Sequence, residues 1–186
     1  MKAKDPDLFS EPYLKFRVRK PSAWRFMPPA WSPVAQMKNA IESPDDWIHL
    51  AKLPFCYAMG NHDSRVHAFP TLQATVRPFS APDNKTASTI LDAQVDMLAQ
   101  QYEDFELLSA SSDAIIGGHR AIMLRGTFLL PTQPDDELIY ISVLSRSFVV
   151  FALGRAFTLG LSGSADERYY HEPDFDSIIG SVRFGT

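Results

Sequence analysis

The sequence contains only one cysteine, which excludes an internal disulfide framework. Cys56 lies in the apolar run Pro54–Met59 with no histidine or lysine close to it in sequence, so we expect a small buried residue rather than a reactive thiol. Basic residues are not in excess either: the chain has 18 lysines and arginines against 22 acidic residues, and the two signs are interspersed. This balance predicts no nucleic-acid partner and no basic membrane patch.

The chain also lacks a long uninterrupted apolar run. The strongest candidate for a membrane span, Leu138–Leu161, contains Arg146 and Arg155, and its β-branched and aromatic residues favour a hairpin over a spanning helix. The first residues are charged and are not followed by the apolar core of a signal peptide. We therefore expect a soluble, cytoplasmic protein without a membrane partner.

Complete catalytic motifs are missing as well. Neither a phosphate-binding loop nor the glycine pattern of a dinucleotide site occurs, and Gly160–Ser164 does not have the spacing of a nucleophile elbow. Gly60–Asp63 matches the core of the metallophosphoesterase signature, whose two-metal chemistry needs further carboxylate and histidine ligands. The upstream Asp-x-His is absent, and Ala121 stands where a downstream histidine is needed. The sequence therefore contains no complete catalytic set.

The polar loop that follows Gly60 has two interpretations. It is either a solvated loop or, with His62, Asp63 and His67 as ligands, a local metal site. Three ligands within six loop residues seldom converge without further support. We expect a solvated loop and no metal or other cofactor.

The length of 186 residues fits one domain. Residues 1–12 carry charge, two prolines and little periodicity, which predicts a flexible N-terminal tail before a single domain over residues 13–186. Apolar residues recur at helical spacing from about Ser88 to Gln101. Strands are predicted over residues 13–19, 24–27, 55–59, 72–77, 105–108, 119–130, 137–144, 148–153 and 156–161. Consecutive strands after a helix predict an antiparallel sheet in an α+β protein.

The C-terminal residues predict a terminus that is docked into the core. Phe175, Ile178 and Ile179 have the spacing that places three apolar side chains on one face of a short helix. Val182 and Phe184 then alternate with polar residues, as in a half-buried strand. We expect loss of these residues to unfold the domain and loss of residues 1–10 to have little effect.

The order of these segments resembles the PsbP-like superfamily. The segments that carry the resemblance are Pro21–Trp24, Pro70–Val76, the helix leading into Asp104–Leu107, Gly117–Ala121, Gly154–Leu159 and Phe175–Phe184. The superfamily includes the Ran-binding Mog nuclear-transport factor, the photosystem II protein PsbP, DcrB-like bacterial proteins and Eag-type secretion chaperones. The resemblance implies a central antiparallel β-sheet flanked by helices on both faces, an α/β/α sandwich, and members that are mostly binding and assembly proteins.

The leading functional hypothesis is a non-catalytic module that binds another protein, in an assembly or chaperone-type role. Its alternatives are a divergent metal-dependent hydrolase that uses the Gly60–Asp63 loop and a carrier of a small apolar ligand between the sheet and its helices. The candidate binding residues are Trp31, which lies between two prolines where an exposed aromatic can anchor a partner, and His62, Asp63 and Arg65 of the polar loop. A core position is the other interpretation of Trp31.

Overall fold

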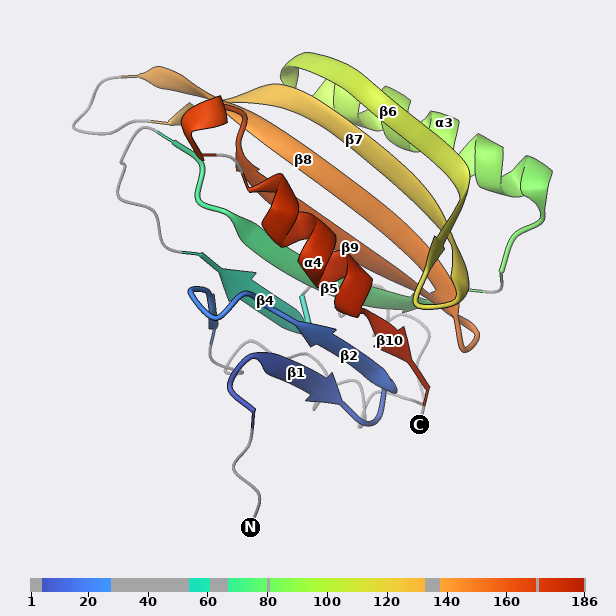
Figure 1. Ribbon diagram of the computed structural model, residues 1–186. Coiled ribbons are helices and arrows are strands. Elements are labelled where there is room, and N and C mark those ends of the chain that lie inside the picture. The colour runs from blue at the N-terminus through green and yellow to red at the C-terminus, as the bar shows by residue number, and fades with distance from the viewer. Residues whose placement is uncertain are drawn as a thin grey trace.

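The computed structural model describes residues 5–27, 54–60, 67–79, 81–132, 138–169 and 171–185. Its main feature is a seven-stranded antiparallel sheet with the strand order β3-β4-β5-β9-β8-β7-β6 (Figure 1). These strands are β3 Arg25–Phe26, β4 Cys56–Met59, β5 Thr71–Pro78, β6 Glu103–Ile116, β7 His119–Thr132, β8 Ile139–Ala152 and β9 Arg155–Ser164.

A smaller antiparallel sheet has the strand order β1-β2-β10. Its strands are β1 Leu8–Glu11, β2 Phe16–Arg19 and β10 Arg183–Phe184. The described helices are α3 (Asn84–Gln101), the 3-10 helix η3 (Glu167–Tyr169) and α4 (Glu172–Ser181). None of the helices in these described ranges has the length and apolar character needed to cross a bilayer.

The central strands place their side chains in two hydrophobic clusters. On β8, Phe148 belongs to the larger cluster and Val149 to the smaller one, and successive side chains of a strand point to opposite faces of the sheet. The larger cluster therefore lies on the face that receives α4, and the smaller one on the face that receives α3 (Figure 1). The helix residues that join these clusters are Phe175, Ile178 and Ile179 of α4 and Ala87 and Leu91 of α3.

The prediction of an antiparallel α+β protein is confirmed, and the consecutive strands predicted within residues 119–161 form an antiparallel meander of β7, β8 and β9. The finer expectation was a sandwich with a layer of helices on each face of the sheet. The described residues do not establish such layers. These residues contain two α-helices, one joined to each hydrophobic cluster.

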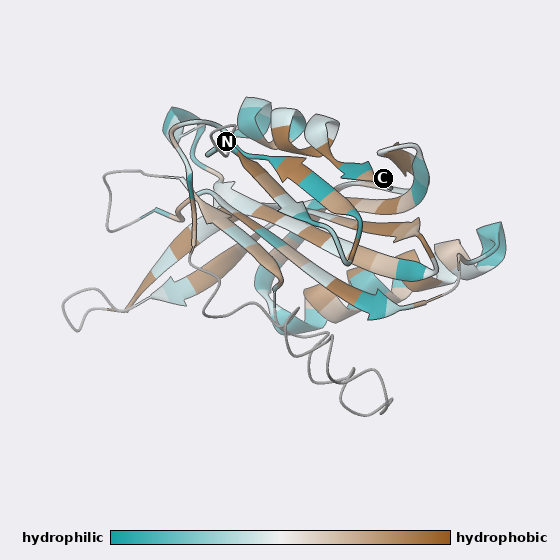
Figure 2. Cartoon of the chain, turned by 90° about the horizontal axis from the view of Figure 1, so that it is seen from below, coloured by the Kyte–Doolittle hydropathy of each residue, from teal (hydrophilic) through white to brown (hydrophobic). Residues whose placement is uncertain are grey.

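The smaller sheet covers the larger cluster at the edge next to α4. In β2, Phe16 and Val18 are buried whereas Arg17 and Arg19 are exposed, and Figure 2 shows such alternation of hydrophobic and hydrophilic residues along the strands. The Phe16 ring stacks on Phe157 of β9 with 5.8 Å between centroids. The buried side chains on one face of β2 therefore attach the small sheet to the large one.

The predicted flexible tail over residues 1–12 is wrong for Leu8–Glu11, which form β1 and pair with β2. Ion pairs to β2 and to the residue after it fix the preceding segment: Asp5 contacts Arg19 at 2.7 Å, and Asp7 contacts Lys20 at 2.6 Å. These partners lie 14 and 13 residues away in sequence, respectively. The acidic residues that suggested a solvated tail are therefore held by cations of the neighbouring strand.

Two predicted strand boundaries are also wrong. The break expected between residues 144 and 148 does not occur, because Ser145, Arg146 and Ser147 pair with both β7 and β9 in one continuous β8. The strand expected to end at residue 108 continues to Ile116 as β6. Cys56 is buried as predicted, and this burial raises the pKa of its thiol, so the reactive thiolate is disfavoured.

The first turn of α3 is capped by Asp83, whose Oδ1 accepts the backbone N–H of Thr86 at 2.7 Å. The hydrogen bonds from Thr86 lower the pKa of the Asp83 carboxyl. The cap therefore stabilises the protein fully above the ordinary carboxyl pKa of about 4, and this stabilisation is lost as pH falls through the lowered pKa.

We expect Asp83→Ala to lower the thermal midpoint at neutral pH by about 2–4 °C, because a helix cap is lost. Asp83→Asn, which keeps an acceptor oxygen, should lose less. Calorimetry from pH 7 to pH 2 should show the wild-type advantage over Asp83→Asn shrinking toward acid. A difference that stays constant over this range would contradict the assignment of the charged cap.

Candidate functional site

The binding residues proposed from the sequence, Trp31, His62, Asp63 and Arg65, lie outside the described residues, and their roles stay predictions. His67, which follows the polar loop, is described and lies next to Ser164 at the end of β9. No group of three or more His, Cys, Asp or Glu side chains in the described part of the chain is arranged to hold a metal ion. The candidates for a functional site within the described residues are therefore two other clusters of polar side chains and one edge of the large sheet.

The first such cluster contains His67, Ser164, Asp166 and Tyr169. His67 Nδ1 lies 3.5 Å from Ser164 Oγ, and its ring packs against Tyr169 with 4.4 Å between centroids. Ser164 Oγ also accepts the backbone N–H of Asp166 at 3.1 Å. The residue types match those of a serine hydrolase, so the geometry must be compared with that chemistry.

This cluster does not have the arrangement of a nucleophile and its base. Ser164 is 4% exposed, and the separation of 3.5 Å from His67 is longer than the 2.6–3.2 Å or so expected for proton transfer. The Arg168 guanidinium binds both carboxylate oxygens of Asp166 and lowers the pKa of that carboxyl. Asp166 is therefore committed to Arg168, and the cluster fastens the junction between β9 and η3.

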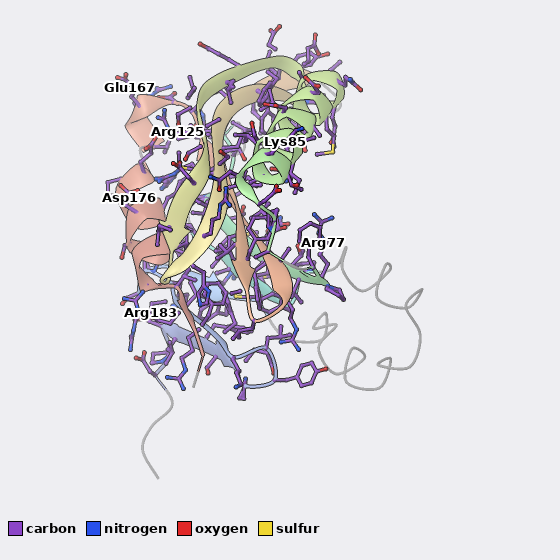
Figure 3. All side chains as sticks on the ribbon, turned by 90° about the vertical axis from the view of Figure 1, so that its right-hand side faces the viewer. Arg77, Lys85, Arg125, Glu167, Asp176 and Arg183 are labelled. Carbon is purple, nitrogen blue, oxygen red and sulfur yellow. The ribbon has the colours of Figure 1, made fainter. Side chains whose placement is uncertain are left out.

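The second cluster lies between α4 and the sheet. Arg125 of β7 and Arg146 of β8 are directly opposite in register, and both reach Glu172 in the first turn of α4. Arg125 Nε donates to Glu172 Oε1 at 2.9 Å, and Figure 3 shows Arg125 between the sheet and α4. Arg146 Nη1 also donates to Asp176 Oδ1 at 2.6 Å. Two cations thus meet two carboxylates, and the cluster docks the helix without leaving a net charge for a ligand.

The third feature is the edge of the large sheet. β6 is the last strand in the order, and β7 is the only described strand that pairs with it. Of the eight residues from Glu103 to Ala110, seven are exposed. Among them Leu107 and Leu108 keep 43% and 39% of their surface in solvent. An exposed strand edge with apolar side chains is a ready contact surface for another chain.

The same edge is strongly acidic. Residues 84–116, which span α3 and β6, contain six carboxylates and one lysine, a formal charge of −5, whereas the whole chain has a net charge of −4. The carboxylates, all exposed, are Asp92, Asp96, Glu103, Asp104, Glu106 and Asp113. We call the residues Glu103, Asp104, Glu106, Leu107 and Leu108 the acidic edge.

Irregular pairing interrupts β6. The register with β7 shifts between Glu103 and Glu106, between Leu107 and Ser109, and between Ser111 and Ala114. At the last shift the Arg120 guanidinium donates to the carbonyl oxygen of Ser112 at 3.2 Å. Bulges and like charges discourage pairing between the edges of two identical sheets. The acidic edge is therefore protected against a second copy of itself, while its carboxylates attract cations.

Comparison with known proteins identifies the fold. The structure of PsbP (CyanoP) from Synechocystis sp. PCC 6803 is similar with a TM-score of 0.55 at 13% identity, over 100% of this chain and 96% of that chain. LpqN, which is involved in cell envelope biogenesis of Mycobacterium tuberculosis, is similar with a TM-score of 0.50 at 18% identity, over 92% and 83% of the two chains. No protein-family model and no curated protein matches the sequence. The chain therefore has a PsbP-like fold, as its resemblance to this superfamily predicted.

Proposed function

We propose that this protein is a non-catalytic binding module, that its partner is another protein, and that the partner contacts the acidic edge. The observation that carries the proposal is the combination of exposed carboxylates and exposed leucines on one strand edge. Leucine side chains supply apolar area that a partner can bury. Carboxylates at the rim of an interface raise the association rate with a cationic partner and exclude acidic ones. The partner segment is therefore expected to carry lysine or arginine beside apolar residues.

The fold supports the same proposal. PsbP-like proteins share an architecture and not a reaction, so function must be argued from surfaces. The described polar clusters hold structural junctions together: one fastens β9 to η3, and the other docks α4 on the sheet. The acidic edge differs from both, because no ion pair or side-chain hydrogen bond is formed by Glu103 or Glu106 within the described residues. Their charges are available to a partner.

The proposal is tested with two substitutions on the acidic edge, Glu106→Lys and Leu108→Ser. Each has a matched control, Glu167→Lys on η3 and Leu138→Ser before β8, because these control residues are also exposed. The proteins are used as baits, and each captured protein is then purified and titrated against all variants. We expect the two edge variants to bind about tenfold more weakly than wild type, a loss of about 1.4 kcal/mol each. The controls should bind like wild type.

Two outcomes would overturn the proposal. The first is a partner whose affinity is the same for wild type and for both edge variants. The second is an equal loss of affinity in the edge variants and in their controls, which would indicate a nonspecific dependence on charge or on hydrophobicity.

A further inference from the structure

Several turns meet at one end of the large sheet. The β6–β7 turn and the β8–β9 turn lie at the same end, because β7 and β8 are antiparallel neighbours with Ala121 opposite Val150. The end of β5 joins them, since the Phe79 N–H donates to the carbonyl oxygen of Gly154 at 3.2 Å. Figure 1 shows these turns together, and Figure 3 views the molecule from this side.

Leu153 forms the tip of the β8–β9 turn in an unfavourable backbone conformation. Its φ angle is +53°, and that of the following Gly154 is +70°. A two-residue hairpin turn with positive φ at both positions strongly prefers Asn-Gly or Asp-Gly, and a branched aliphatic residue is strained there. Burial does not compensate for this strain, because Leu153 is 43% exposed and belongs to neither hydrophobic cluster. A strained, exposed leucine suggests a role in contact with another surface.

A second exposed aliphatic side chain lies on the neighbouring hairpin. Ile115 is 66% exposed, the largest exposed fraction of any large hydrophobic residue in the described ranges. It is opposite Arg120 in the pairing of β6 with β7, and only Ile116 separates it from the Gly117–Gly118 turn. Two adjacent hairpins therefore each present an aliphatic side chain to solvent at or near their turn.

Cations from separate segments lie toward this end of the molecule. Arg77 of β5 and Lys85 of α3 are exposed, and Figure 3 labels both on the side that faces the viewer. Arg155 follows the Leu153–Gly154 turn directly. The guanidinium groups of Arg77 and Arg155 lie 5.4 and 5.5 Å from the ring centroids of Phe79 and Tyr13. We call Arg77, Lys85, Ile115, Leu153 and Arg155 the turn end.

The acidic residues of this region are engaged locally. Asp83 accepts from Thr86, Asp113 accepts from the Ser111 hydroxyl at 2.6 Å, and the Glu11 carboxylate accepts the Tyr13 N–H at 3.0 Å. These bonds hold the three carboxylates next to their own backbone segments. Because the donors are neutral, each carboxylate keeps its negative charge. Lys15 of the β1–β2 turn and Arg120 of β7 lie at the same end, so five cations there exceed three carboxylates.

We propose that the turn end docks on an anionic lipid bilayer, with Leu153 and Ile115 entering the interface and Arg77, Lys85 and Arg155 contacting lipid phosphates. Exposed aliphatic side chains beside cations need no complementary cavity in a fluid apolar phase with an anionic surface. The leucines of the acidic edge lie beside carboxylates, which an anionic bilayer repels. Basic side chains next to inserted residues lie at the level of the headgroups, where anionic lipids attract them.

This surface could not be read from the order of charges along the chain, which predicted no membrane partner, because its cations come from β5, α3 and β9. It is also separate from the acidic edge. Glu106 precedes Ile115 by nine residues on the same strand, a span of about 30 Å at roughly 3.3 Å per residue. Docking of the turn end therefore leaves the acidic edge accessible, and the two proposals can fail independently.

The test measures sedimentation of the full-length protein with vesicles of phosphatidylcholine, with or without phosphatidylserine. We expect binding that requires phosphatidylserine and weakens with added salt. Leu153→Asn relieves the strained turn, so this variant should have an equal or higher thermal midpoint while its partitioning onto phosphatidylserine vesicles falls about tenfold. Leu138→Asn, at another exposed leucine, should bind like wild type. Because Leu153→Asn is not expected to destabilise the fold, its loss of binding cannot be attributed to unfolding.

Three results would overturn the proposal. They are absence of wild-type binding to either kind of vesicle, equal binding with and without phosphatidylserine, and wild-type affinity in Leu153→Asn. Binding of a soluble protein at the turn end, lost in Leu153→Asn while vesicles are not bound, would also replace the lipid with a protein partner. Affinity for a partner at the acidic edge should be unchanged in Leu153→Asn whichever result is obtained.

Discussion

Replacing Phe175 with alanine should lower the free energy of unfolding by about 3–5 kcal/mol. Phe175 of α4 is fully buried, and its ring meets Trp24 edge-on with 6.4 Å between centroids. It also packs closely on β9, since a Cβ atom added at Gly163 would lie 3.3 Å from the Phe175 ring. The cavity cannot close unless α4 moves, and the arginine–carboxylate cluster holds α4 in place.

Urea denaturation at neutral pH measures this effect. Ser177→Ala, at an exposed position of the same helix, is the control and should leave the midpoint nearly unchanged. Phe184→Ala should cost less than Phe175→Ala, because Phe184 is only half-buried although its ring packs on Phe16 and Phe157. A Phe175→Ala midpoint equal to that of wild type would show that α4 does not need this side chain to dock.

Removing residues 1–11 should destabilise the domain by about 3 kcal/mol or more. This reverses the sequence-based expectation that the first ten residues have little effect. The deletion removes β1 together with Phe9, whose ring packs on Phe26 and Phe55 with 5.7 and 6.2 Å between centroids. It also removes Asp7, the carboxylate partner of Lys20, whose side chain is only 6% exposed.

The deletion is compared with single substitutions by chemical denaturation. Phe9→Ala and Asp7→Ala should each cause part of the loss, and Ser10→Ala, at an exposed position of β1, should cause almost none. If the deletion variant unfolds at the wild-type midpoint, β1 contributes nothing to stability, and the tail assigned from the sequence is the better description.

The elements that could be predicted from the sequence are those whose own residues repeat with a clear period. The helical spacing of Leu91, Val95 and Leu98 predicted α3, and the alternation in residues 156–161 predicted β9. Burial of Phe175, Ile178 and Ile179 was predicted for the same reason, since three apolar residues at helical spacing must be covered by another layer. These are properties of a short segment.

The elements that were missed depend on residues elsewhere in the chain. β1 is short and charged, and it becomes a strand because β2 supplies hydrogen-bonding groups and the cations Arg19 and Lys20 supply partners for its acids. The second half of β6 is rich in small polar residues with low strand propensity, and its partner β7 carries the apolar side chains. The Gly117–Gly118 turn was a usable signal, because a hairpin turn implies two strands of similar length.

The candidate sites could not be predicted for the same reason, because they depend on residues that are distant in sequence. An acidic segment at residues 103–106 is visible in the sequence, but whether it lies at an edge depends on the strand order. The turn end combines side chains from β5, α3, β6, the β8–β9 turn and β9, and only the fold brings them together. The four residues proposed from the sequence were chosen by local composition, and all four lie outside the described ranges.

The pairing of β10 with β2 has a consequence for synthesis of the chain. Phe184 is the register partner of Phe16, so the third strand of the small sheet leaves the ribosome long after the first two. Until then the β1–β2 hairpin lacks its third strand, and Phe16 lacks the Phe184 ring that packs against it in the folded protein. Nascent chains should therefore leave the side of Phe16 that Phe184 covers open to chaperones until residues 183–184 emerge, and full protease resistance should follow that emergence rather than completion of the large sheet.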